Sequence, residues 1–162
     1  MKIKSFALIT IENKTTEEVF DFACKTTNLA KVFHGYGPIP GIKNAEIENK
    51  GEVKEGSKRI TYQTDGSVLT DEIMEFERGK KQAYKVTGFK APNSFIIDYC
   101  FSEWLFAPLE KGSEIKWEFT FVLKSSLAFP IAMIIKYFMG KAQQNCLNNI
   151  KKYLLEVNSL IE

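Results

Sequence analysis

The sequence is poor in the residues that build metal sites and disulfide frameworks. Its 162 residues include one histidine, His34, and three cysteines, Cys24, Cys100 and Cys146, which lie far apart and form no CxxC pair. A disulfide framework needs an even set of suitably spaced cysteines, and a zinc site needs clustered Cys and His ligands. We therefore predict no metal, no cofactor and three buried free thiols.

An excess of one charge is also missing, because 22 Lys and Arg nearly balance 20 Asp and Glu, and the basic residues form no block. We therefore expect no nucleic-acid partner. Met1 to Ile11 has an alternating pattern instead of the continuous apolar stretch and cleavage site of a secretion signal, which predicts cytoplasmic localisation. The longest apolar run, 127–139, is shorter than the about 20 residues of a membrane span, so no integral membrane segment is expected.

Aromatic side chains, in contrast, are abundant. The 13 Phe, 6 Tyr and 2 Trp make up 13% of the chain, and they fall mainly in segments with a strand pattern. The length and the hydrophobic fraction of 44% fit one domain over 1–162 with a substantial core. The aromatic excess fits a lined cavity and a densely packed core about equally well.

The order of predicted elements begins with a strand over 3–12, where the side chains alternate. Thr15 or Thr16 can cap a first helix, and acidic residues follow in its first turn. A second short helix over about 28–33 is ended by the glycines and prolines of 34–41. From 44 to 124 the pattern is strand after strand, with short turns between them.

The hairpin around Asp65 and Gly66 reads as a two-residue type I′ turn. This register places Arg59 opposite Glu72, and the pair either points into the interior as a buried ion pair or faces solvent. The more apolar character of the opposite face favours the solvent-facing alternative. Asp71 is expected to be an ordinary surface charge, because single carboxylates are seldom buried.

A second hairpin joins strands predicted over 94–107 and 114–124. In the second of these strands a row of apolar side chains shares one face, namely Ile115, Trp117, Phe119, Phe121 and Leu123, and this row is expected inside. An even loop pairs Phe106 with Trp117 and sends Trp104, Phe106, Cys100 and Asp98 inward, whereas an odd loop sends Tyr99, Phe101 and Glu103 inward. We favour the even loop, which then requires a bulge or a partner to cover the aromatic residues left outside.

The final segment, about 127–161, is predicted to be one long helix with Pro130 in its first turn. It is amphipathic from Gln143 onward, but 127–139 is apolar nearly all round. This front half must therefore meet loops, a partner chain or a membrane surface, which leaves a homodimer open.

Strand, two short helices, strand meander and long terminal helix is the α+β helix-grip arrangement, with a curved antiparallel sheet of about seven strands. Four segments carry a resemblance over the whole chain: TTEEVFDFACKTTNLAKVF, EGSKRITYQTDGSVLTDEI, SEWLFAPLEKGSEIKWEF and the terminal LNNIKKYLLE. In their order and spacing they resemble the START and birch-pollen-allergen superfamily (SRPBCC). Within it, they are similar to the polyketide cyclase/dehydrase-like and coenzyme Q-binding-like lipid transport branch.

The resemblance implies a cavity between sheet and helix that holds a small hydrophobic or amphipathic ligand, such as a lipid or a polyketide. Arg59 and Glu72 match charged positions of the related pattern GSxR…DG…E. The candidate ligand-binding residues are Arg59, Tyr62, Glu72, Met74, Tyr84, Trp104, Phe106, Trp117, Phe119, Phe121, Met133, Tyr137 and Gly140. The alternative is a cyclase- or dehydratase-like enzyme with a cavity carboxylate or Tyr as acid or base, so enzyme status stays open.

Overall fold

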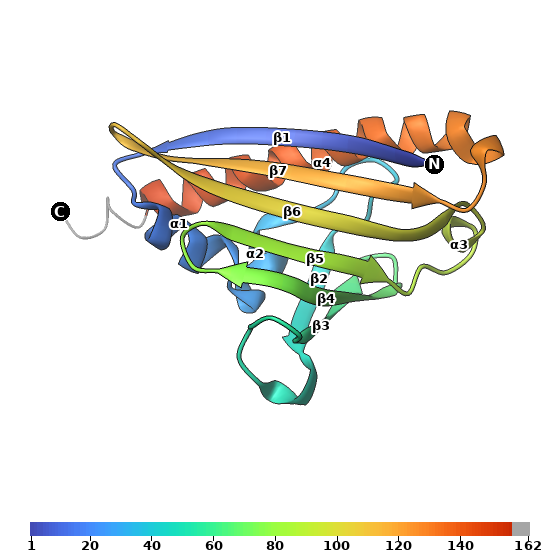
Figure 1. Cartoon of the computed structure of the whole chain (residues 1–162), viewed down its shortest axis with the longest axis horizontal. Coiled ribbons are helices and arrows are strands. Elements are labelled where there is room, and N and C mark those ends of the chain that lie inside the picture. Colours follow the sequence, from blue (N-terminus) through green and yellow to red (C-terminus); the bar gives the residue numbers. More distant parts are fainter. Residues whose placement is uncertain (157–162) are drawn as a thin grey trace.

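The computed structural model describes residues 1–156. In order, its elements are β1 (Lys2–Glu12), α1 (Thr16–Ala23), η1 (Thr26–Asn28), α2 (Leu29–Val32), β2 (Ile42–Ile47), η2 (Glu48–Lys50), β3 (Lys58–Gln63), β4 (Val68–Glu77), β5 (Lys81–Thr87), α3 (Asn93–Ile96), β6 (Ile97–Leu109), β7 (Gly112–Leu123), η3 (Ser126–Ala128) and α4 (Phe129–Glu156). Within these residues the strands form one seven-stranded antiparallel sheet in the order β1-β7-β6-β5-β4-β3-β2. This confirms the predicted helix-grip fold (Figure 1).

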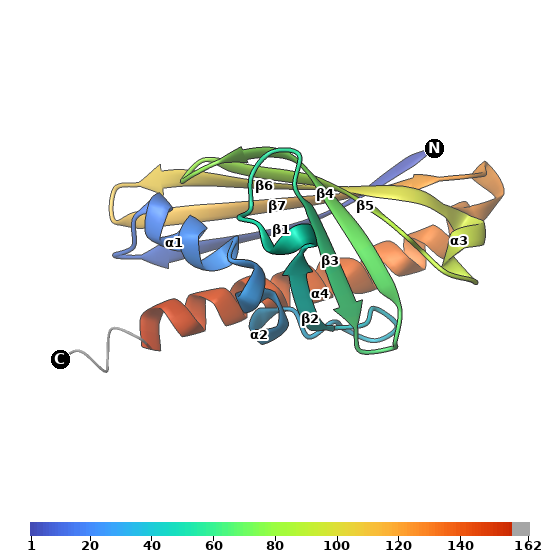
Figure 2. The same cartoon turned by 90° about the horizontal axis from the view of Figure 1, so that it is seen from below.

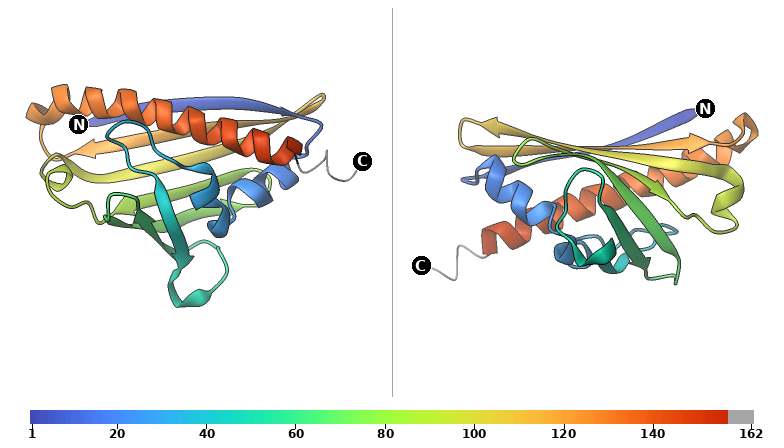
Figure 3. Two further views of the ribbon diagram at one scale, coloured as in Figure 1. Left: turned by 180° about the vertical axis from the view of Figure 1, so that it is seen from behind. Right: turned by 60° about the horizontal axis from the view of Figure 1, so that its bottom comes forward.

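The sheet curves over α4, which lies along its inner face (Figure 2). The helix is tied to β1 by side-chain hydrogen bonds, since the Ser5 hydroxyl donates to Gln143 Oε1 at 2.6 Å and Lys151 Nζ donates to the Thr10 carbonyl at 2.9 Å. At the other edge β2, β3 and β4 bend towards the helix, with α1 and α2 closing the side (Figure 3). The inner face of the sheet and the helix therefore enclose the interior.

The strand β7 behaves as its alternation predicts. Its inward row from Ile115 to Leu123 is buried, with no member more than 8% exposed. The predicted burial of Cys24, Cys100 and Cys146 is also confirmed.

The helix start at Thr15 is a capping box, in which the Thr15 hydroxyl accepts from the Glu18 amide and the Glu18 carboxylate accepts from the Thr15 amide. Two otherwise unpaired donors of the first turn are thereby satisfied.

The register predicted for the β3–β4 hairpin is wrong by one residue. Arg59 pairs with Asp71 and Lys58 with Glu72, because the turn contains three residues instead of two. A type I′ turn needs positive φ at both central residues, but only Gly66 adopts it, at φ 82°. The Asp65 carboxylate instead accepts from the Ser67 amide at 2.9 Å and closes the wider turn. Arg59 faces inward, against the favoured prediction. The register makes Asp71 its partner on this face, so Asp71 is buried against expectation and Glu72 is exposed.

The even loop predicted between β6 and β7 is confirmed, since Leu109 pairs with Gly112 across two residues. The pairing lies two residues away from the predicted one, with Trp104 opposite Trp117, so the faces are unchanged and Trp104 points inward. The prediction that Asp98 points inward is wrong. A bulge between Ile97 and Tyr99 turns Ile97 into the core and leaves Asp98 exposed.

The short helix α3 was not expected, and the first residues of the predicted strand lie in it. The long helix begins at Phe129, with Pro130 in its first turn as predicted. Its predicted end at Ile161 lies outside the described residues. None of the helices within 1–156 is both long enough and apolar enough to cross a membrane.

Candidate functional site

A cavity of about 270 Å³ lies between the inner face of the sheet and α4. Its apolar lining comes from the sheet, from α2 with the loop that follows it, and from α4: Val86, Ile97, Phe119, Phe121, Leu29, Phe33, Pro38, Ile39, Pro40, Ile42, Ile135, Met139 and Cys146. This volume is slightly below the lower end of the range for small-molecule pockets, roughly 300 Å³. The cavity is therefore sized for a small ligand.

One wall of the cavity is polar and comes from alternate residues of β3 and their partners on β4. Arg59 Nε and Nη2 both donate to Asp71 Oδ2, at 2.9 and 2.8 Å, and the two side chains are 1% and 7% exposed. The guanidinium carbon lies 4.8 Å from the centre of the Tyr84 ring, in a cation–π arrangement. Thr61 and Gln63 continue the wall, with Gln63 Nε2 donating to Thr61 Oγ1 at 3.1 Å.

Burial and charge act in opposite directions on this ion pair. Burial raises the pKa of the Asp71 carboxyl above its ordinary value, against the attraction and hydrogen bonds of Arg59. Burial alone would lower the pKa of Arg59, but the neighbouring Asp71 carboxylate outweighs this and the pKa lies above its usual range. Arg59 therefore carries a fixed positive charge in the cavity wall.

Next to the ion pair lies a cluster of aromatic side chains with polar atoms. Trp104 and Trp117 stack with ring centres 4.1 Å apart, and Trp117 Nε1 donates to the Ser102 hydroxyl at 2.8 Å. Burial, helped by the charge of Asp71, raises the pKa of Tyr84 to about 12, with opposing contributions from Arg59, Ser102 and Trp104. The Tyr84 phenol is consequently neutral at physiological pH.

Two buried donors of this wall have no hydrogen-bond partner among the described residues. They are Nη1 of Arg59 and Nε1 of Trp104, and both residues line the cavity. Trp104 interacts weakly with the Tyr84 hydroxyl, without the geometry of a hydrogen bond. A buried donor that is left unpaired costs roughly 1–3 kcal/mol of folding free energy. An acceptor atom inside the cavity would remove this cost, so the wall is suited to a ligand with an oxygen at one end.

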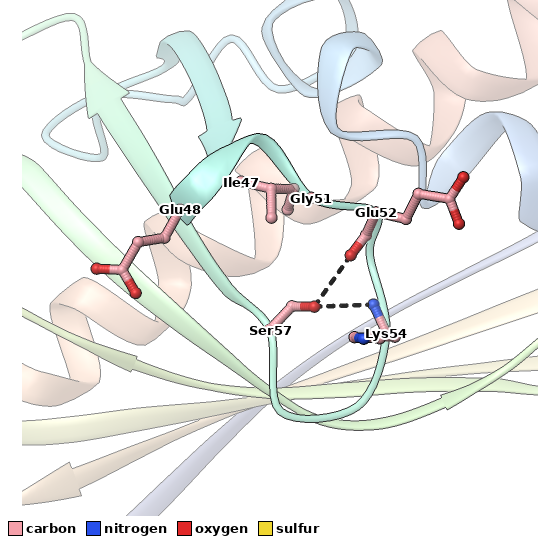
Figure 4. Close-up of a pocket in the computed structure, with 6 residues that line it drawn as sticks. All are labelled: Ile47, Glu48, Gly51, Glu52, Lys54 and Ser57. Atoms are coloured by element: carbon pink, nitrogen blue, oxygen red, sulfur yellow. Dashed lines mark hydrogen bonds between the residues drawn. The ribbon is translucent and has the colours of Figure 1, made fainter.

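A second hollow lies outside the sheet, on the segment between β2 and β3 (Figure 4). It is lined by Ile47, Glu48, Gly51, Glu52, Lys54 and Ser57. The Ser57 hydroxyl donates to the Glu52 carbonyl at 3.1 Å and accepts from the Lys54 amide at 3.1 Å. This hollow is wide and open, and its Ser57 hydroxyl is used within the loop, so the cavity under the sheet is the better candidate site.

Comparison with known proteins agrees with this architecture. Residues 9–155 match the family described as polyketide cyclase / dehydrase and lipid transport. The chain belongs to this family. No curated protein matches the sequence.

Several solved structures have the same fold as this member of the polyketide cyclase / dehydrase and lipid transport family, although their sequence identity to it is low. Ara h 8.0201 is 17% identical with a TM-score of 0.70, covering 96% of this chain and 99% of the other. The Zhui aromatase/cyclase from Streptomyces sp. R1128 is 11% identical with a TM-score of 0.73, covering 94% and 93%. Norcoclaurine synthase from Thalictrum flavum, in complex with dopamine and hydroxybenzaldehyde, is 14% identical with a TM-score of 0.69, covering 96% and 88%.

The cavity of this family member contains six of the residues predicted to bind ligand: Arg59, Tyr84, Trp104, Trp117, Phe119 and Phe121. Their contact with a ligand stays a prediction. Phe106 is buried but packs elsewhere, with its ring 5.0 Å from that of Phe20.

The remaining predicted residues do not line the cavity. Glu72 lies on the outer face because of the hairpin register, and Tyr62 lies there because it alternates along β3 with the inward Thr61 and Gln63. The Tyr62 hydroxyl donates to Glu46 Oε1 at 2.9 Å. Met74 sits at a bulge of β4 and is 44% exposed. On α4, Met133 and Tyr137 are exposed, and Gly140 is half-buried outside the lining.

Three cavity residues were not predicted, namely Asp71, Thr61 and Gln63. The Asp65 side chain, which favours a turn closed by an Asx hydrogen bond and so moves the register by one residue, could have revealed Asp71. Thr61 and Gln63 alternate with Arg59 on β3 and therefore share its face. Ile135 was also missed. It is an inward residue of a helix segment whose sequence is apolar on every face.

Proposed function

We propose that this protein binds a small amphipathic molecule in the cavity under the sheet. The apolar body of the ligand would lie against side chains such as Phe119 and Met139. Its oxygen atom, from a carboxylate, a carbonyl or a phenol, would accept hydrogen bonds from Arg59 Nη1 and Trp104 Nε1. The observation that supports this proposal is the pair of unpartnered donors in the wall of an otherwise apolar cavity.

The expected affinity is modest. Apolar burial contributes about 25 cal/mol per Å², and a hydrogen bond to a charged group adds roughly 1.5–3 kcal/mol. Association and ordering consume a large part of this free energy. A dissociation constant in about the micromolar range is consistent with these contributions.

Native mass spectrometry of the purified protein, followed by titration with a panel of fatty acids, flavonoids and steroids, tests the proposal. Each acceptor-bearing ligand is paired with an analogue of the same shape that lacks the oxygen. We expect the ligand with the acceptor to bind and the analogue to bind more weakly. A protein that is isolated empty and binds no member of the panel would contradict the proposal.

The two stacked tryptophans supply a matched pair of variants. Trp104→Phe removes the unpartnered N–H and is expected to weaken binding of the acceptor-bearing ligand by roughly tenfold, but not that of the analogue. Trp117→Phe removes an N–H that is already used by Ser102, so it should lower stability and leave this selectivity unchanged. Equal effects of both variants on selectivity would argue against an acceptor at Trp104.

A cyclase- or dehydratase-like enzyme is the second candidate, and it is supported by two titratable groups in the cavity wall, Asp71 and Tyr84. Asp71 is held by two hydrogen bonds from Arg59, which weakens it as a base, and the neutral Tyr84 phenol can act only as a proton donor. Incubation with a linear polyketone, analysed by mass spectrometry, tests this candidate. Turnover that is lost in Tyr84→Phe while binding is retained would favour the enzyme over the carrier.

A further inference from the structure

The helix α3 and the start of α4 lie at the same end of the molecule (Figure 1), and both carry exposed apolar side chains. The most exposed of these side chains, here called the apolar rim, are Phe95, Leu127, Ile131, Ile134 and Tyr137, with exposed fractions of 76%, 89%, 51%, 58% and 59%. The two segments are joined by the backbone hydrogen bond from Lys124 to Ile96 at 3.0 Å. Grouped exposure of large apolar residues is typical of an interaction surface.

The apolar rim borders the cavity. The loop residues Lys90 to Pro92 and Asn93, the first residue of α3, line the cavity, as do Ile135 and Met139 of α4. The same turns of α4 thus present Ile135 and Met139 to the cavity and Ile131 and Ile134 to solvent. A partner molecule or surface that covers the apolar rim would therefore lie beside the cavity lining.

The charge around the apolar rim is predominantly positive. The sequence contains no Asp or Glu between Arg78 and Ile97, or between Phe119 and Leu155. Exposed lysines flank the rim at Lys90, Lys124 and Lys141. Two carboxylates lie in the adjoining elements: the exposed Asp98, in the β6 bulge just after α3, and Asp65, which is hydrogen-bonded to Ser67.

Exposed apolar side chains with flanking lysines fit a lipid surface better than a second copy of the chain. A second copy of the chain, packed symmetrically, would bring the same three lysines against each other with only Asp98 to compensate them. An anionic lipid surface would accept the apolar side chains and attract the lysines at once, and tyrosine is favoured at the membrane–water boundary. Because no described helix can span a membrane, the contact would be peripheral.

We propose that the apolar rim seats on the surface of an anionic lipid bilayer. Leu127, Ile131 and Ile134 enter the boundary between headgroups and acyl chains, and the flanking lysines contact the headgroups. The cavity lining at 90–93 then lies next to the lipid. The proposal does not depend on the ligand discussed above, since bilayer binding and cavity binding are measured separately.

Flotation with vesicles of phosphatidylcholine alone, and of phosphatidylcholine mixed with phosphatidylglycerol, tests the proposal. We expect the protein to float with the mixed vesicles and to do so less at high salt, because salt screens the attraction. The substitutions Lys124→Gln and Lys141→Gln should each weaken this binding by roughly fivefold. Leu127→Asp should weaken it by roughly tenfold or more, because a charge replaces a membrane-buried leucine.

Leu109→Asp is the matched control. Leu109 is 45% exposed at the β6–β7 turn, at the opposite end of the molecule, so its replacement should leave flotation unchanged. Circular dichroism checks that each variant is folded, and native mass spectrometry checks cavity binding independently. Absence of flotation with mixed vesicles, or equal losses in Leu109→Asp and Leu127→Asp, would overturn the proposal. A concentration-dependent dimer abolished by Leu127→Asp, without flotation, would assign the apolar rim to a homodimer interface.

Discussion

Replacing Arg59 by methionine would remove one half of the buried ion pair and leave the Asp71 carboxylate in the cavity wall without its two donors. Loss of one partner of a buried pair costs about 3–5 kcal/mol, because the remaining charge is desolvated and uncompensated. In a chain of this length, 1 kcal/mol corresponds to a change of about 2–4 °C in Tm. We therefore expect Arg59→Met to lower Tm by roughly 6–20 °C.

The double variant Arg59→Met/Asp71→Leu separates the pair from its components. Replacement of a whole buried pair by apolar side chains is often neutral or stabilising by about 1–4 kcal/mol, so the double variant should be more stable than Arg59→Met. Urea unfolding followed by circular dichroism at neutral pH gives the free energies for the complete cycle. The exposed pair Arg78 and Asp21, with side chains 63% and 49% exposed, is the control. Arg78→Met should cost less than about 1 kcal/mol.

The reasoning would be refuted if Arg59→Met cost as little as Arg78→Met, or if the two substitutions at Arg59 and Asp71 were additive. Either result would mean that water reaches the carboxylate and that the wall is wet. The acceptor site proposed for the ligand would then lose its physical basis, since solvated donors carry no penalty for a ligand to remove.

Three further outcomes are expected. The folded-state pKa of Tyr84, about 12, exceeds its ordinary value of 10.0, so the neutral phenol stabilises the fold fully below about pH 10, and this contribution is lost as the pH rises through 12. Urea unfolding at increasing pH should therefore show the free energy of unfolding fall by roughly 3 kcal/mol in the wild-type protein. The Tyr84→Phe variant, which has no phenol to ionise, should not show this fall. Val86→Phe, which fills the cavity, should abolish ligand binding in native mass spectrometry while the protein stays folded, and Leu105→Phe on the outer face should not; undiminished binding in Val86→Phe would place the ligand elsewhere. Thr15→Ala, which breaks the capping box with Glu18, should cost about 1 kcal/mol in urea unfolding, and no measurable cost would contradict the role of the cap.

The sequence was sufficient for the fold because its local signals agree with one another. Thr15 and Glu18 mark a helix start, and the alternation from Ile115 to Leu123 marks a strand with one buried face. These signals depend on neighbours a few residues away, which a single sequence contains. The order of such elements was then enough to indicate a helix-grip arrangement.

The polar wall was not predictable in the same way. Its composition depends on whether Asp65 lies inside a two-residue or a three-residue turn, a difference set by one side-chain hydrogen bond. A shift of one residue exchanges the two faces of a strand, so Asp71 and Glu72 change places. A pattern of charges cannot decide this, because both residues are acidic.

The roles of the residues on α4 were also beyond the sequence. Residues 127–139 are apolar in every direction, so periodicity cannot tell the lining residues Ile135 and Met139 from the exposed Ile134 and Tyr137. Only the position of the helix on the sheet makes this distinction. Cavity size is similarly a property of packing between distant segments, and the aromatic content alone left open whether a cavity exists.

The three-residue turn between β3 and β4 makes the chemical character of the interior depend on the length of the turn. A turn of Asp65 and Gly66 alone, with Thr64 paired to Ser67, would shift β4 by one residue relative to β3 and exchange its two faces. If β3 kept its place, Glu72 would come to face Arg59 from the inner side, while Ile73 would move to solvent. The longer Glu72 side chain would then lie in the cavity wall in place of Asp71. The selectivity for ligands would change, although every side chain that β3 contributes to the wall had been preserved.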